Sequence, residues 1–341
     1  MRAVCFGELM LRLVPPGYLR ISQTDRLEMT FGGAEANAAV SLANYGVDAR
    51  YVTRLPNNPI GDAAVQSLRA LGVDTGYIAR GGERLGIYFV EKGASMRPSK
   101  VIYDRKHSSI AAVEPGMIDW DKAFEGADWF HWTGITPALS DGAAAVTLEA
   151  CKAAKAKGLT ISCDLNYRKN LWSRDKAKQV MTELAQYVDV MIANEEDSQD
   201  VFGIAAEGSD IEGGRLSEAG YSALAKRLAD TFGCKKVAFT LRESFSANDN
   251  DWSGLLYDRA KDEAVRSRKY SIRIVDRVGG GDAFGGGLIY GLLSGLDDSD
   301  AINYAAAASA LKHTIEGDFN RVTPDEVKAL VGGSVSGRVQ R

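Results

Sequence analysis

The chain has 341 residues, of which 45% are hydrophobic and 25% are charged, and these values are typical of a globular protein. Its formal net charge of −4 argues against nucleic acid or an anionic membrane as a partner, because both need a basic face. No stretch approaches the roughly 20 apolar residues of a membrane span, and the N-terminus lacks the pattern of a signal peptide. These features predict a cytoplasmic protein whose partners are small molecules.

The first 108 residues combine helices with segments of alternating polarity. Residues 1–9 read as a buried central strand, and residues 35–46 and 61–72 have the apolar spacing of helices. Alternation at 27–33, 86–93 and 99–108 is typical of antiparallel strands with one solvated face. We expect a small β lid, formed from about residues 10–33 and 86–108, that covers a site.

From residue 127 onward, short apolar segments alternate with amphipathic ones. Strand-like segments are predicted at 127–135, 159–166, 188–193 and 235–241, and helices at 141–158, 175–187 and 220–233. This order predicts a parallel sheet with helices on both faces. The predicted fold class is therefore α/β: one domain over 1–335 with a doubly wound, mostly parallel sheet and the inserted lid, followed by a C-terminal tail at 336–341.

The cysteines and histidines indicate no metal site. The spacing of the cysteines suits neither a zinc site nor a disulfide framework, so we expect buried thiols in a reducing compartment. The histidines are equally dispersed along the chain. These two sets are Cys5, Cys151, Cys163 and Cys234, and His107, His131 and His313.

Glycines crowd around one aspartate in the stretch RVGGGDAFGGGLIYG, residues 277–291. A glycine-rich loop that leads into a helix presents backbone N–H groups at a positively polarised helix end, and phosphate is the commonest occupant of such a site. Asp282 would then face a reacting hydroxyl while the N–H groups face a phosphoryl group. The alternative interpretation is a tight turn packed under a neighbouring element.

Three further stretches place polar groups beside predicted helix starts and strand ends. The glycine pair at 32–33 permits close approach of a ligand, and Asn37 follows one turn into a helix, although a capping turn would give the same pattern. The acidic groups of ANEED, residues 193–197, can organise Mg²⁺ through water, or they can be a solvated first helical turn. At the carboxyl end of another predicted strand, where open parallel sheets bind ligands, lie Asp164, Asn166 and Arg168.

Together these stretches resemble the ribokinase-like (PfkB) family of carbohydrate kinases over nearly the whole chain. GGAEANAAVSLANYG (32–46) is similar to the N-terminal signature of the family, and DRVGGGDAFGGGLI (276–289) is similar to its C-terminal signature. NEED (194–197) matches the Asn-x-x-Glu motif except that Asp197 ends it. Within the family, the chain most resembles the 2-keto-3-deoxygluconate kinases.

The resemblance implies a reaction in which ATP, with Mg²⁺, phosphorylates 2-keto-3-deoxygluconate to 2-keto-3-deoxy-6-phosphogluconate. It makes Asp282 the catalytic base, and it assigns the anion hole to Gly279, Gly280 and Gly281. It assigns nucleotide contacts to Asn194, Asp197, Thr240, Arg242, Gly279 and Gly281. It implies that Asn194 and Asp197 hold Mg²⁺ through water and that Asp276 binds a monovalent cation, for which K⁺ is the candidate.

The sugar site is expected to suit an acid. Two arginines in the segments VIYDRKHS and LNYR would bind a carboxylate as a fork, which a neutral hexose does not need. The alternative is that both arginines are surface charges. With Gly33, Asn37 and Asp282, the expected sugar-binding residues are Tyr88, Tyr103, Arg105 and Arg168.

Departures from the family pattern leave other functions open. Arg277 replaces a small hydroxyl residue, Asp197 is shorter than glutamate, and the segment 240–254 replaces a short glycine-rich turn near the nucleotide. A fructokinase or other neutral-sugar kinase, or an inactive sugar-binding sensor, remains an alternative. A dinucleotide-dependent oxidoreductase is disfavoured because no Gly-x-Gly-x-x-Gly follows the first strand. The resemblance also suggests a homo-oligomer joined through the lid.

Overall fold

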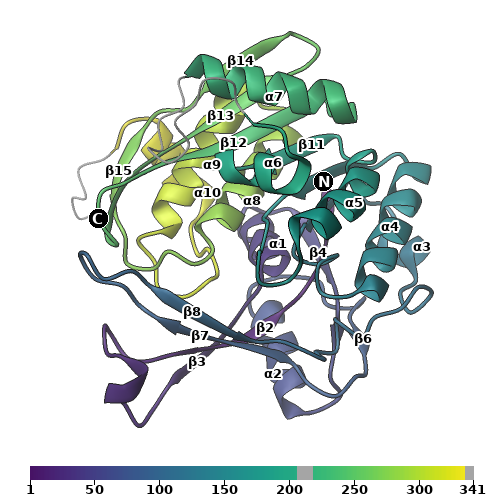
Figure 1. Cartoon of the computed structure of the whole chain (residues 1–341), viewed down its shortest axis with the longest axis vertical. Helices are drawn as coiled ribbons and strands as arrows, with labels where there is room; N and C mark the ends of the chain where they lie inside the picture. The colour runs from purple at the N-terminus through teal and green to yellow at the C-terminus, as the bar shows by residue number, and fades with distance from the viewer. Residues whose placement is uncertain (206–217, 335–341) are drawn as a thin grey trace.

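A large sheet covered by helices forms the body of the molecule, and a small sheet projects from its lower side (Figure 1). The structure is a computed structural model that describes residues 1–205 and 218–334. The tail predicted at 336–341 lies outside the described residues. No helix in the described part of the chain is long and apolar enough to cross a membrane.

Within the described residues, the body sheet has nine strands in the order β14-β13-β12-β11-β10-β9-β1-β4, with β15 paired to β13. All neighbours from β12 to β4 are parallel, whereas β13 pairs antiparallel with β12, β14 and β15. The fold class predicted from the sequence is therefore confirmed. The strands are β1 (Arg2–Phe6), β4 (Asp48–Val52), β9 (Trp129–Thr133), β10 (Thr160–Asp164), β11 (Val190–Ala193), β12 (Lys236–Ser244), β13 (Asp249–Asp258), β14 (Glu263–Arg266) and β15 (Tyr270–Arg273).

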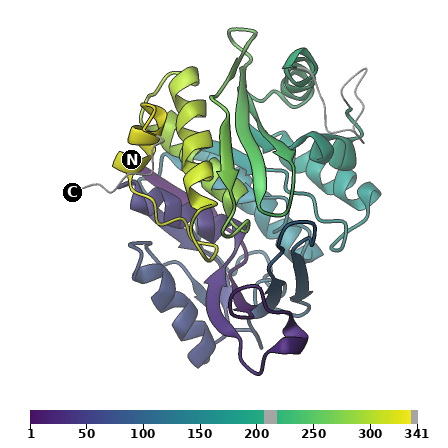
Figure 2. The same cartoon turned by 90° about the vertical axis from the view of Figure 1, so that its left-hand side faces the viewer.

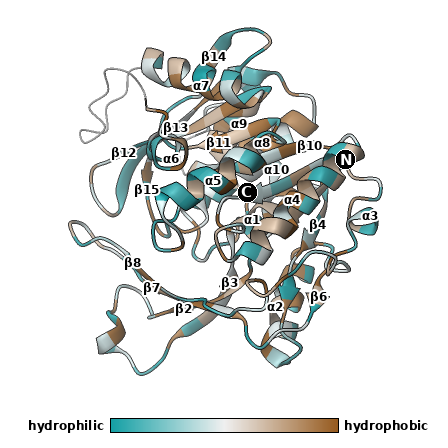
Figure 3. Cartoon of the chain, turned by 45° about the vertical axis from the view of Figure 1, so that its right-hand side comes forward, coloured by the Kyte–Doolittle hydropathy of each residue, from teal (hydrophilic) through white to brown (hydrophobic). Residues whose placement is uncertain are grey.

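Helices cover both faces of this sheet because alternate strand residues point to opposite sides. On β12, Val237 and Phe239 join the core under α4, α5 and α7, whereas Ala238 joins the core under α1, α2, α8 and α9. Hydrophobic residues gather along the central strands and the helix sides turned towards them, as Figure 3 shows. The helices are α1 (Ala34–Asn44), α2 (Pro59–Arg69), α3 (Trp120–Ala123), α4 (Asp141–Ala156), α5 (Arg174–Ala185), α6 (Glu195–Phe202), α7 (Glu218–Phe232), α8 (Gly280–Leu293), α9 (Asp298–Lys312) and α10 (Pro324–Val331).

The projecting sheet has four strands in the order β3-β2-β7-β8 and lies below the body in two views at right angles (Figures 1 and 2). We call these four strands the lid: β2 (Met10–Val14), β3 (Glu28–Gly32), β7 (Gly86–Glu91) and β8 (Lys100–Asp104). The segments predicted as antiparallel strands do pair antiparallel, β3 with β2 and β7 with β8, whereas the central pair of β2 and β7 is parallel. Strand β2 follows β1 in the chain and runs parallel to β7 in the lid.

Two smaller predictions from the sequence are settled by the structure. All four cysteines are buried free thiols, as expected. The segment 240–254 is a β-hairpin, in which β12 and β13 extend past the sheet and pair up to Ser244 and Asn250. The remaining short elements are β5 (Arg54–Leu55), β6 (Ala79–Arg80) and a 3₁₀ turn at Ile21–Gln23.

Candidate active site

The glycine loop ends where α8 begins. Gly279 is the N-cap with φ of 85°, and a Cβ there would lie 2.1 Å from the backbone oxygen of Asp318, so only glycine fits. Gly280 and Gly281 open the helix, and first-turn N–H groups have no acceptor within their own helix. The loop therefore offers N–H donors and a positive helix end to an anion.

The glycines further along α8 have another role, which is helix packing. A Cβ on Gly287 or Gly291 would lie 3.0 Å from the Cα of Ala305 or Ala301 on α9. Gly286 likewise packs against Ser41 of α1. Members of the same run of glycines therefore differ: Gly279, Gly280 and Gly281 form the start of the helix, whereas those further along allow α8 to pack against α1 and α9.

Asp282 lies in the first turn of α8 and accepts a 2.6 Å hydrogen bond from Nδ2 of Asn37. Asn37 is held at the start of α1, where its N–H bonds the carbonyl of Gly33 at 2.7 Å. Burial raises the pKa of Asp282 to about 6, and the Asn37 hydrogen bond opposes that rise. A carboxyl group with a pKa near neutrality is suited to accept a proton from a substrate.

A cavity of about 380 Å³ opens in front of Asp282 at the carboxyl edge of the sheet. It brings together residues from Met10 to Asp318, and most of the predicted site residues line it. The predicted residues that line it are Gly33, Asn37, Arg168, Asn194, Asp197, Thr240, Arg242, Gly279, Gly280, Gly281 and Asp282.

Asn194 and Asp197 form a capping box at the start of α6. The Asn194 side chain accepts the N–H of Asp197 at 2.9 Å, and Asp197 accepts the N–H of Asn194 at 3.3 Å and of Tyr167 at 3.1 Å. Asp197 is buried, and burial raises its pKa to about 6. The two residues therefore cap α6 rather than form a solvated turn, and both also border the cavity.

Carboxylates gather on one wall of this cavity. Asp164 ends β10 and lines the cavity together with Asp197 and Asp282. Burial raises the pKa of Asp164 well above its usual value, and the negative charges of Asp197 and Asp282 raise it further. A divalent cation would relieve this repulsion, and Mg²⁺ takes few carboxylates while keeping several waters. In the described part of the chain no group of three or more His, Cys, Asp or Glu forms a closed metal site, so such an ion would rely on water and phosphate ligands.

Two arginines, Arg242 and Arg277, line another part of the same cavity. Arg277 donates to the backbone oxygen of Ala247 at 3.3 Å and to Oδ1 of Asn250 at 3.0 Å, and so attaches the loop to the hairpin. Burial and the nearby charge of Arg242 lower the pKa of Arg277. Among the described residues no carboxylate pairs with either arginine, which leaves this part of the cavity positive.

A second cavity, of about 760 Å³, lies beneath the lid and shares Arg168 and Glu196 with the first. Tyr103 and Arg105 line it, and the Arg105 guanidinium stacks 4.7 Å from the centre of the Tyr103 ring. All the predicted sugar residues except Tyr88 are thus divided between two cavities that meet at Arg168.

The two predicted carboxylate-binding arginines differ in their partners. Arg105 is buried and paired with Glu8, with Nε 2.8 Å from Oε2, and Ser108 also donates to Glu8. Arg168 donates only to the backbone oxygen of Tyr167 at 3.2 Å, and no described carboxylate forms an ion pair with it. Arg168 is therefore the one with a guanidinium available to a ligand's carboxylate.

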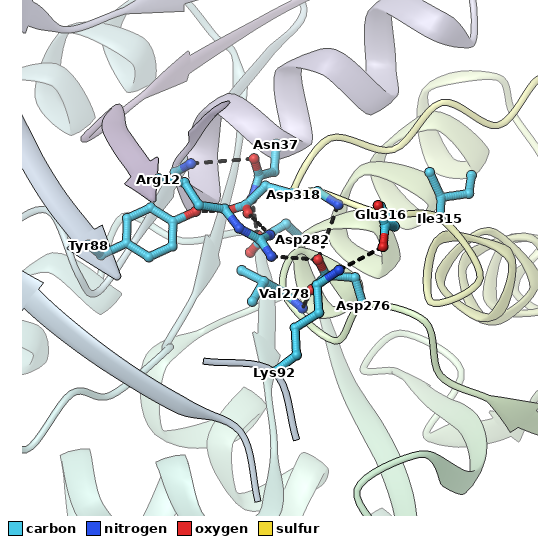
Figure 4. A network of polar contacts seen from close by, with 12 residues as sticks. Arg12, Asn37, Tyr88, Lys92, Asp276, Val278, Asp282, Ile315, Glu316 and Asp318 are labelled. Atoms are coloured by element: carbon cyan, nitrogen blue, oxygen red, sulfur yellow. Dashed lines mark hydrogen bonds and ion pairs between the residues drawn. The ribbon is translucent and has the colours of Figure 1, made fainter. Parts of the chain in front are cut away.

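A buried charge network joins the lid to the loop. Arg12 of β2 lies between two carboxylates, 2.5 Å from Asp276 and 2.5 Å from Asp318 (Figure 4). Tyr88 of β7 donates to Asp318 at 2.6 Å, so its hydroxyl is engaged there. Neither Asp276 nor Tyr88 lines the first cavity, whereas Asp318 does.

Sequence reasoning missed Arg12 and Asp318. The sequence does contain a signal for Arg12: an arginine inside the apolar segment MLRLV needs a buried partner for its charge. Asp318 lies in an irregular segment after α9, and no local pattern marks it. Only the fold brings together these residues, which are 306 positions apart.

The fold and the site define a class of enzyme: an α/β phosphotransferase in which an aspartate and an anion-binding helix end face one cavity. The profile of the pfkB family carbohydrate kinases matches residues 2–323. The chain belongs to this family.

Named relatives resemble the chain over nearly its whole length. A 2-dehydro-3-deoxygluconokinase structure from Thermotoga maritima is 50% identical, with a TM-score of 0.94, and the match covers 98% of this chain and 100% of the other. A 2-dehydro-3-deoxygalactonokinase of Haloferax volcanii is 34% identical, with 98% of each chain covered. A 2-dehydro-3-deoxygluconokinase of Bacillus subtilis is 30% identical, covering 93% of this chain and 91% of the other.

Proposed function

We propose that the chain uses ATP to phosphorylate the 6-hydroxyl of 2-keto-3-deoxygluconate, which is also called 2-dehydro-3-deoxygluconate. The observation that carries this proposal is the position of Arg168. It borders both the cavity of Asp282 and the cavity beneath the lid, and no described carboxylate pairs with it. The two gluconokinase relatives support the same substrate.

In the proposed step, Asp282 accepts the proton of the 6-hydroxyl. The hydroxyl oxygen forms a bond to the γ-phosphorus of ATP while the bond from that phosphorus to the β–γ bridging oxygen breaks, and ADP leaves. The N–H groups at the start of α8 stabilise the charge on the transferring oxygens, since such donors are already oriented before reaction. Asn37 holds the Asp282 carboxylate by its Oδ2 atom.

The remaining residues position the reactants. Bound Mg²⁺ would neutralise phosphate charge, and Asp164, Asp197 and Asn194 are the residues that would hold it through water. Arg242 and Arg277 would bind the phosphates of the nucleotide in the positive part of the cavity. Arg168 would bind the sugar carboxylate as a planar fork, with Tyr103 and Arg105 closing the lid side of the site.

A second candidate substrate is the epimer 2-keto-3-deoxygalactonate, because one relative of similar identity is a galactonokinase. The two acids present the same carboxylate and the same 6-hydroxyl, so Arg168 and Asp282 would serve both equally. Discrimination between them then depends on side chains around the remaining hydroxyls.

A substrate panel tests the proposal. ADP formation is measured with ATP and Mg²⁺ on 2-keto-3-deoxygluconate, its galactonate epimer, fructose and ribose. We expect kcat/KM for one of the two acids to exceed that for either neutral sugar by more than 100-fold. A higher value for fructose or ribose would overturn the acid assignment, and turnover of none of the four would favour a sugar-binding sensor.

We also propose that two copies associate through the lid. The outer strands expose Met29 on β3 and Ile102 and Tyr103 on β8, with 58%, 55% and 41% of their surfaces accessible. Apolar side chains gathered on one sheet suit an interface between copies. Light scattering would give the mass, and Ile102→Ser should shift a dimer towards monomer, whereas a monomeric wild-type chain would contradict the proposal.

A further inference from the structure

Lys312, the last residue of α9, is fully buried directly beneath the glycine loop. A fully buried lysine is rare because removing an ammonium group from water is costly unless nearby groups compensate. Its Cε atom would be 3.2 Å from a Cβ on Gly279, so the side chain fills the space under the N-cap of α8. The kinase reaction described above does not use this residue.

The Lys312 ammonium is held by oxygen atoms from two segments that flank the loop. Nζ donates to the backbone oxygen of Asp276 at 3.3 Å and to that of Ile315 at 3.4 Å. Asp276 comes three residues before Gly279, and Ile315 precedes the segment that contributes Asp318. The ammonium therefore ties together the chain on both sides of the anion-binding N-cap.

Charged groups surround Lys312 beneath the loop. Burial lowers the pKa of the Lys312 ammonium and the charge of Arg12 adds to this effect, whereas the nearby carboxylates of Asp276, Asp318 and Asp282 oppose it. Arg12 and Lys312 provide two positive charges for the buried carboxylates of Asp276 and Asp318. Without Lys312, one negative charge would remain uncompensated beneath a loop that must attract phosphate.

Backbone oxygens and a carboxylate at such a site are also the ligands that a monovalent cation takes from proteins. The family resemblance implies a monovalent cation at Asp276. In the structure, the Asp276 carboxylate instead accepts Arg12, the Val278 N–H at 3.2 Å and the Gly317 N–H at 3.1 Å, and Lys312 bonds its backbone oxygen. The positive charge expected from an ion is thus supplied by a side chain.

We propose that Lys312 is a positioning residue that serves as a built-in cation, fixing the anion-binding loop so that turnover needs no added monovalent ion. The inference deepens the proposed kinase function and rests on it. Lys312 touches neither cavity wall, so its effect passes through the loop and through the field at the helix start. It should therefore change kcat more than the KM for the sugar.

The first test compares salts. The wild-type enzyme is assayed in KCl, NH₄Cl and N-methylglucamine chloride at equal ionic strength, with ADP measured by chromatography so that no coupling enzyme responds to the salt. We expect kcat to agree within about twofold among the three. An increase of more than about fivefold in KCl would show that an exchangeable ion is needed and would overturn the proposal.

The second test removes the ammonium group. Lys312→Met should lower kcat by about 10- to 100-fold, while the KM for the sugar stays within about threefold of the wild-type value. This loss of kcat is comparable to or smaller than the loss seen when an enzyme is deprived of one hydrogen-bond donor to the charge that develops in the transition state. Lys312→Ala should lose as much in N-methylglucamine but recover at least fivefold in KCl or NH₄Cl, because the vacated oxygen cage can take a small cation. A variant of either kind with wild-type kcat in N-methylglucamine would refute the assignment.

Lys236→Met is the matched control. Lys236 is largely buried at the opposite end of β12 and bonds Asp258 and Asp298 with its ammonium, so its loss removes a compensated charge far from the loop. This variant should keep kcat within about twofold and show no response to KCl. Loss of kcat in this control equal to that of Lys312→Met would mean that the effect is general destabilisation, against the proposal.

A binding measurement separates this inference from the substrate assignment. The melting temperature of Lys312→Ala should rise with KCl relative to N-methylglucamine chloride, whereas that of the wild type should not, because an ion that binds only the folded state stabilises it. This readout needs no sugar, so it stands even if the proposed acid is not the substrate. Equal responses of the melting temperature to KCl in Lys312→Ala and in the wild type would contradict the proposal that Lys312 serves as a built-in cation. If Lys312→Ala does not fold, the comparison of wild-type kcat in the three salts still tests the proposal.

Discussion

The glycine loop and the lid meet at the same site but are specified by different interactions. The loop contributes backbone N–H groups, and its turn is formed by neighbouring residues, since Gly279 at φ of 85° leads directly into α8. The lid contributes side chains held by buried ion pairs between distant segments, such as Arg12 with Asp276 and Arg105 with Glu8. Changes at the loop face should therefore alter rate, whereas changes in the lid should alter stability as well.

The largest effect is expected at the loop. Asp282→Asn should lower kcat by about 10²–10⁴-fold, because asparagine has nearly the same size but cannot accept the proton. The melting temperature of this variant should not fall below that of the wild type, because burial disfavours the ionised Asp282 carboxylate and the neutral asparagine avoids that cost. Steady-state kinetics and a thermal melt check both points, with the exposed first-turn Asp300→Asn as control; a rate within threefold of the parent would remove Asp282 from the role of base.

In the lid, breaking the Arg105 pair should mainly cost stability. Arg105→Ala leaves Glu8 buried and unpaired, and losing one partner of a buried pair typically costs about 3–5 kcal/mol in the free energy of unfolding. Arg84→Ala, which breaks the exposed Arg84–Asp104 pair, should cost less than about 1 kcal/mol. Denaturant unfolding of the two variants measures this difference, and similar losses would mean that the lid is not held by its buried pairs.

Arg168 should behave differently from Arg105, the other arginine predicted to bind the sugar carboxylate. Arg168→Ala should leave the free energy of unfolding nearly unchanged but lower kcat/KM for the sugar acid by roughly 10- to 100-fold, since a charge-assisted hydrogen bond is lost. The kcat/KM of residual turnover on fructose should change far less. Equal losses on both sugars would show that Arg168 binds phosphate rather than the sugar carboxylate.

The smallest expected effect is on the pH profile. Because burial raises the pKa of Asp282 to about 6 and the base must be ionised, kcat/KM should be constant near pH 7.5 and fall about tenfold per unit below pH 6. Removing the amide donor in Asn37→Ala should move this acid limb to higher pH, because the hydrogen bond favours the charged form. An acid limb that stays near pH 4 would contradict the raised pKa.

The sequence alone determined the glycine-rich start of α8 and the strands and helices that alternate from β9 to β12, because periodicity and glycine placement act over a few residues. The pairing of Arg105 with Glu8, the sharing of Arg12 between Asp276 and Asp318, and the burial of Lys312 could not be predicted in this way. Each depends on charges that are distant in the chain and become neighbours only when the lid and the end of α9 close around the loop, so only the tertiary structure decided them.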